Sequence, residues 1–67
     1  MLNGTYEGRP VHAFRIDGKV YCVLRDCFFG AIWNKQNDII TVFAPAGMSY
    51  HQAALEAAAG MERGAYI

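Results

Sequence analysis

The dipeptide Asp17-Gly18 constrains this chain most, because it lies between two segments in which apolar residues alternate. A type I′ turn needs positive φ at both central residues, and Asp-Gly meets that need at low cost. Closing the turn between Ile16 and Lys19 pairs residues 11–15 with residues 20–24. The sequence therefore predicts an N-terminal antiparallel β-hairpin.

The same register divides the hairpin side chains between two faces. Phe14 lies opposite Tyr21 and His12 opposite Val23 on one face, and the other face holds Val11, Ala13 and Arg15 against Val20, Cys22 and Leu24. Both faces are largely apolar. A sheet with one face in solvent would instead have one apolar and one polar face. We therefore expect a helix to cover one face and a partner to cover the other.

The segment from Asp26 to Asn34 fits two structures. As a helix it begins at Asp26 as N-cap, and its apolar residues recur at a spacing of three or four. As a strand it turns through residues 35–37 into Ile39–Phe43, the safest strand after the hairpin, which ends before Pro45. Both alternatives stay open from the sequence.

A C-terminal helix is predicted over residues of about 49–63. Ser49 and Gln52 have the spacing of a capping box, and Gly64 is a natural C′ residue. The expected buried stripe is mostly small: His51, Ala54, Leu55, Ala58 and Met61. Taken together, the patterns predict one α+β domain over residues 1–67: a small antiparallel sheet of three or four strands with this helix packed on it.

Length and charge limit the classes of function. The chain has 67 residues, of which 54% are hydrophobic, and its formal net charge is zero. A monomer therefore exerts no general pull on nucleic acid, although Arg9, Arg15, Lys19 and Arg25 give the first 25 residues a mild basic bias. Because ordering costs about 1.5 kcal/mol per residue, a core this small needs support, and a homodimer would provide it.

The two cysteines suggest no established chemistry. Cys22 and Cys27 lack the tight spacing of zinc ligands, and neither His12 nor His51 is near them in sequence. No histidine is placed by a motif to activate Cys27 as a nucleophile. Both thiols are interpreted as reduced and buried, and we expect no catalytic residue, cofactor or metal. A small thiol or metal enzyme is the third hypothesis for function.

Residues 11–27 resemble the opening of the Bro-N/antirepressor family of phage and large DNA viruses. The resemblance rests on Asp17-Gly18, Tyr21 and Asp26 and extends over residues 11–33. That family begins with a strand, an acidic-glycine turn, a second strand and an aspartate that starts a helix. The resemblance implies a phage-type regulatory protein; beyond Trp33 the chain departs from the family pattern, so DNA binding is not carried over.

The sequence is best explained by a small non-enzymatic regulatory protein that binds and blocks a protein partner. The alternative is a dimeric nucleic-acid-binding transcriptional regulator that uses the basic side of the hairpin. No membrane association is expected, and because residues 1–4 lack the features of a signal peptide, we expect a cytoplasmic location, in the host cell if the protein is phage-encoded. The expected partner-binding residues are Trp33, Lys35, Tyr21, Arg15 and Arg25.

Trp33 is the residue proposed to contribute most to binding. It precedes the longest polar segment of the chain, residues 34–38. A tryptophan beside a polar turn is difficult to bury fully. A large apolar ring that stays partly exposed to solvent often contacts a binding partner. The other interpretation is that Trp33 caps the core beneath the turn.

Overall fold

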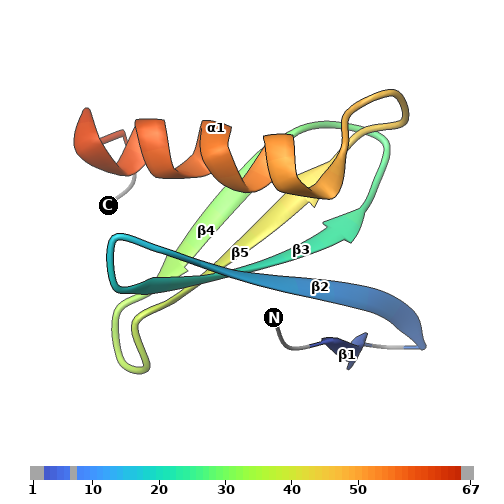
Figure 1. The fold of residues 1–67 in the computed structure, drawn as a ribbon, viewed down its shortest axis with the longest axis horizontal. Coiled ribbons are helices and arrows are strands. Elements are labelled where there is room, and N and C mark those ends of the chain that lie inside the picture. Colours follow the sequence, from blue (N-terminus) through green and yellow to red (C-terminus); the bar gives the residue numbers. More distant parts are fainter. Residues whose placement is uncertain (1–2, 7, 66–67) are drawn as a thin grey trace.

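The computed structural model describes residues 3–6 and 8–65, and it contains one sheet and one helix (Figure 1). The sheet order is β1-β2-β3-β5-β4. The strands are β1 (Asn3–Tyr6), β2 (Arg9–Ile16), β3 (Lys19–Arg25), β4 (Gly30–Asn34) and β5 (Ile39–Ala44), followed by helix α1 (Tyr50–Glu62). The α+β class with a C-terminal helix on a small sheet is confirmed.

The N-terminal hairpin has the predicted register. Asp17 and Gly18 have φ values of 52° and 80°, as a type I′ turn requires. β2 and β3 are antiparallel, with Phe14 opposite Tyr21 and His12 opposite Val23. The local turn chemistry therefore sets the pairing of the two longest strands.

The ambiguous segment is a loop followed by a strand. Residues 26–29 connect β3 to β4, and β4 then pairs antiparallel with β5 through a turn at residues 35–38, where Asp38 has a φ of 56°. The helical alternative for 26–34 is wrong. Asp26 caps no helix; its Oδ1 accepts a hydrogen bond from the Cys27 amide at 2.6 Å.

The sheet is mixed and not purely antiparallel, because β5 lies between β3 and β4 and runs parallel to β3. The described sheet also has five strands, one more than the largest number expected. Burial explains the order. In β5, Ile40 and Val42 are fully buried and the alternate residues are half-buried, so this strand suits the interior of the sheet. β4 is more exposed and takes the edge.

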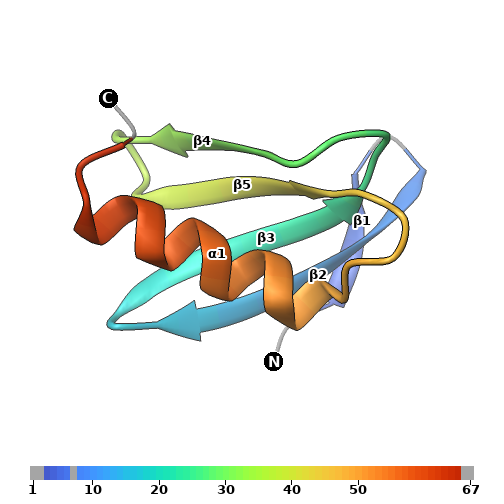
Figure 2. The ribbon, with the colours of Figure 1, turned by 90° about the horizontal axis from the view of Figure 1, so that it is seen from above.

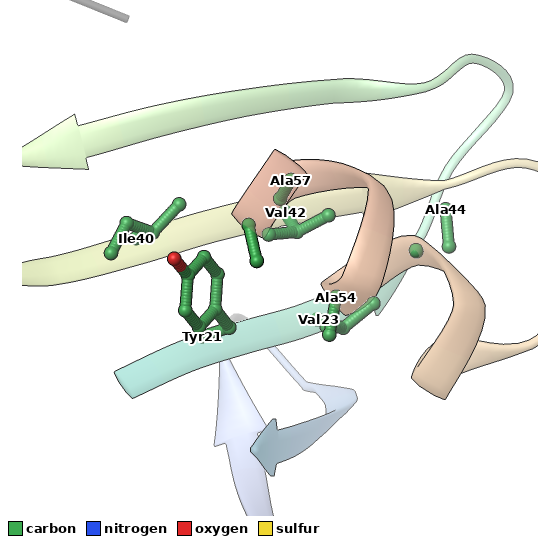
Figure 3. Close-up of a cluster of buried hydrophobic side chains, with 9 residues drawn as sticks. Tyr21, Val23, Ile40, Val42, Ala44, Ala54 and Ala57 are labelled. Atoms are coloured by element: carbon green, nitrogen blue, oxygen red, sulfur yellow. The ribbon is translucent and has the colours of Figure 1, made fainter. Parts of the chain in front are cut away.

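The core lies between α1 and one face of the sheet, called here the covered face (Figures 1 and 3). Its largest buried side chains come from β3 and β5, and the helix residues of the buried cluster are all alanine, while Tyr50 and Met61 of the helix pack against it partly buried. The cluster comprises Tyr21, Val23, Ile40, Val42, Ala44, Ala53, Ala54, Ala57 and Ala58. Small residues allow the helix backbone to lie close to the sheet.

The helix begins as predicted, and Ala54 and Ala58 are buried as expected, but the rest of the buried stripe differs. The Ser49 hydroxyl accepts from the Gln52 amide at 3.0 Å, and Gly64 has a φ of 71° just after the helix. Leu55, expected inside, is 47% exposed, and His51 is also exposed. The buried stripe is Ala53, Ala54, Ala57, Ala58 and Gly60, because alanine lets several faces of this helix pack equally well.

Candidate functional site: an apolar strip on the open face

The face of the sheet turned away from α1, called here the open face, carries exposed apolar side chains. Ala31 and Trp33 of β4 pack with the helix-side core, so the alternate residues Gly30 and Ile32 point to the open face. Ile32 is 61% exposed. Gly30 pairs with Phe43 of β5, which places the half-buried Phe43 on the same face.

Phe28, in the loop before β4, completes this patch. A Cβ added at Gly30 would lie 3.2 Å from the Phe28 ring and 3.5 Å from the Phe43 ring, so the missing side chain of Gly30 leaves room for both. The two rings are tilted, with centroids 6.1 Å apart, and Phe28 is 59% exposed. Phe28, Ile32 and Phe43 are called here the open-face strip. Phe28 and Ile32 thus give this end of the open face an exposed apolar surface.

The strip was missed at the level of sequence. Phe28 and Ile32 lie four residues apart, a spacing that suited the helical interpretation, and their exposure depends on where β4 lies in the sheet. The only signal was the aromatic pair at 28–29 next to a glycine. Phe29 is 38% exposed in the same loop.

Arg25, one of the expected contact residues, is used inside the fold. Its Nη1 donates to the carbonyl oxygens of Ala44, Pro45 and Met48 at 3.3, 2.5 and 2.6 Å. Its guanidinium carbon also lies 4.4 Å from the centroid of the Tyr50 ring. Arg25 therefore holds the loop between β5 and α1 in place.

The basic residues of the hairpin do not form one patch. Arg9 Nη1 lies 4.0 Å from Asp26 Oδ2 and donates to the Arg25 carbonyl oxygen at 3.2 Å, at the end of the hairpin away from its turn. Lys19, at the turn end, lies 3.7 Å from Asp38 Oδ2. Arg15 is exposed and points to the open face, away from Lys19. Charges that are divided in this way offer no continuous track for a phosphate backbone.

Trp33 is half-buried and tied to the β4–β5 turn. Its ring packs against the core and its Nε1 donates to Asp38 Oδ1 at 2.9 Å. The Nζ atoms of Lys19 and Lys35 lie 5.7 and 5.3 Å from the ring centroid. Trp33 and Lys35 are thus brought together. These contacts favour a structural role in which Trp33 caps the covered face beneath the turn.

Tyr21 is a core residue and is only 2% exposed. Its expected role as a contact residue is therefore corrected: position 21 lies on the central strand β3 beneath the helix (Figure 3). Of the five expected contact residues, only Arg15 and Lys35 are fully exposed, and they lie on different parts of the surface.

The thiols occupy different environments. Cys22 is half-buried on the open face, and burial raises the pKa of its thiol. Cys27 is exposed in the loop before β4, so the expectation that it is buried is wrong. No helix starts at this position among the described elements.

The histidines are engaged with aromatic rings. The His12 ring stacks on Tyr50 with centroids 3.9 Å apart, and His51 lies 5.3 Å from Phe14. In the part of the chain that the structure describes, no three His, Cys, Asp or Glu side chains come together as metal ligands would. Nor does α1, over those same residues, have the length and apolarity of a membrane-spanning helix.

Comparison of the chain with protein-family models, with curated proteins and with solved structures found no match.

Proposed function

We propose that this protein is a small non-enzymatic interaction module that binds a protein partner through the open-face strip. The observation that supports it is the exposure of Phe28 and Ile32, at 59% and 61%, in a domain whose other face is closed by a helix. Aromatic and large aliphatic side chains supply most of the energy at protein interfaces. The contact surface of the partner is correspondingly apolar and low in charge.

The module acts by occupying a surface of its partner, as a regulator or inhibitor does. Its proposed class is a phage-type regulator with a cytoplasmic location; the strand, Asp17-Gly18 turn and strand of the Bro-N/antirepressor resemblance support this, whereas Asp26 starts no helix. A homodimer is part of the proposal. The buried helix residues are all alanine, so each buries little apolar area, and a second copy would add the buried area that a small core lacks.

The test begins with tagged protein retained on beads in an extract of the source cell, with nuclease added to one half. A partner recovered from both halves is then purified and its binding measured by calorimetry. We expect Phe28→Ser to weaken that binding by at least about tenfold, which corresponds to about 1.4 kcal/mol.

Leu55→Ser is the matched control, since it removes an exposed apolar side chain, 47% exposed, from the helix on the other side of the sheet. Equal affinity for the wild type and Phe28→Ser would contradict the proposal. Recovery that disappears with nuclease would instead favour the nucleic-acid-binding alternative.

A further inference from the structure

Among the described strands, β4 forms one border of the sheet and pairs on one side only, with β5. In an antiparallel pair, alternate residues turn their N–H and C=O groups to the far side, where they are free to bond another strand. The other border, β1, turns beneath the sheet in both views (Figures 1 and 2), whereas β4 runs along its outer rim. The β4 border therefore is a template for a further strand.

β4 lacks the features that usually prevent such pairing. Its sequence is Gly-Ala-Ile-Trp-Asn, without a charged residue or a proline, and its central residue Ile32 is 61% exposed. Natural edge strands are protected by lysine, by proline, by a bulge or by a covering segment. An unprotected edge in a chain of zero net charge is suited to association.

We propose that a second copy of this chain pairs its own β4 antiparallel to this β4, about a two-fold axis at Ile32. The pairing joins two five-stranded sheets into one. It sets Ile32 beside the partner's Ile32, Gly30 opposite the partner's Asn34, and Ala31 opposite the partner's Trp33. Each small residue then faces a large one, so the strand is complementary in shape to itself.

The charges also suit this register. Lys35, the first charged residue after β4, lies in the turn beyond the strand, three positions from the two-fold axis. The two Lys35 residues are separated by six positions, roughly 20 Å along the strands at about 3.3 Å per residue. Pairing therefore juxtaposes no like charges. The inference rests on the proposed homodimer and assigns its interface; it does not depend on which protein the open-face strip binds.

Sedimentation velocity with charge variants tests the interface. Ile32→Lys and Ile32→Glu each place like charges together at the two-fold axis, and each is expected to weaken dimerisation at least tenfold and to sediment as a monomer at micromolar concentration. An equimolar mixture of the two is expected to form a heterodimer. Leu55→Lys makes the same change on the helix, and it is expected to remain a dimer.

Cross-linking tests the register and does not rely on a charged variant. In a Cys27→Ser background, Ile32→Cys is expected to form a disulfide between copies on mild oxidation. Asn34→Cys, on the same strand and face, places its two thiols four residues apart, beyond the reach of a disulfide, and is expected to stay uncrosslinked.

The outcomes separate the claims. A wild-type chain that sediments as a monomer overturns both the homodimer and this interface. A dimer that persists in Ile32→Lys, or equal cross-linking at positions 32 and 34, overturns the interface and leaves the homodimer standing. Loss of partner binding in Phe28→Ser is measured separately and bears on the proposed function alone.

Discussion

The two faces of the sheet are built from the same alternating strands, but they are buried to different extents: the open face is buried at Leu24 of β3, which is 1% exposed, and is uncovered at its β4 end. On the covered face, Tyr21, Val23, Ile40 and Val42 are at most 2% exposed beneath the helix. On the open face, Phe28 and Ile32 are more than half exposed, although they are as apolar as the core residues. Hydrophobicity alone therefore does not say which face a single chain buries.

The difference follows from the helix. The described residues form one helix, and four alanines let it lie close to β3 and β5, which carry the largest buried side chains. β4 lies one strand further out. None of the described elements packs over its outward side chains, so Ile32 stays exposed to solvent, whereas the apolar side chains of the covered face are buried beneath the helix.

The largest expected effect contrasts one aromatic residue from each face. We expect Tyr21→Ala to lower the free energy of unfolding by about 3–5 kcal/mol, because it empties a fully buried site. Phe28→Ala, on the open face, should change it by only about 0.5 kcal/mol. Urea unfolding followed by circular dichroism measures both.

If Tyr21→Ala does not fold, Ile40→Val keeps the contrast measurable, with an expected loss of about 0.5–1.5 kcal/mol. A loss in Phe28→Ala as large as that in the buried variants would show that the two faces are not distinct.

Trp33 lies between the extremes, since it is half-buried on the covered face at the edge strand. We expect Trp33→Ala to cost about 2–3 kcal/mol of stability through lost ring packing. Trp33→Phe keeps a smaller ring and loses the hydrogen bond to Asp38, which contributes about 1 kcal/mol. An unchanged melting temperature in Trp33→Ala, together with lost partner binding, would restore Trp33 as a binding residue.

Arg25 and Arg15 allow the same comparison between an engaged and an exposed polar side chain. We expect Arg25→Met to cost about 1.5 kcal/mol, because three carbonyl oxygens of residues 44–48 lose a charged donor. Arg15→Met, at an exposed site of the same hairpin, should change stability by less than about 0.5 kcal/mol. Thermal unfolding measures both, and similar values for the two variants would contradict the role assigned to Arg25.

The smallest effect is on thiol reactivity. Only the thiolate reacts with an alkylating reagent, and burial raises the pKa of the Cys22 thiol, so less of it is ionised near pH 8. We expect exposed Cys27 to react about tenfold faster or more, as followed by mass spectrometry. As the pH rises above the usual thiol range, Cys22 ionises and the ratio falls. Faster modification of Cys22 than of Cys27 would contradict the burial described for Cys22.

Features that depend on near neighbours were predictable from the sequence. The Asp17-Gly18 turn determines the β2–β3 register, and the Ser49 cap marks the start of α1. The position of β5 was not predictable, because its parallel pairing with β3 joins residues 19 positions apart, such as Val20 and Ile39. The burial of Tyr21 and the exposure of Phe28 both depend on that arrangement. For this reason the sequence alone did not identify which apolar side chains are exposed.

The insertion of β5 between β3 and β4 determines the order in which the molecule can assemble. During synthesis, β4 emerges before β5, yet β4 has no place in the sheet until β5 has filled the gap beside β3. The strand β4 therefore joins the sheet together with β5 or after it. Non-local pairing of this kind slows folding. Until it is complete, β3 presents an open apolar border on the nascent chain, so the interval before docking is when this small protein is most prone to aggregate.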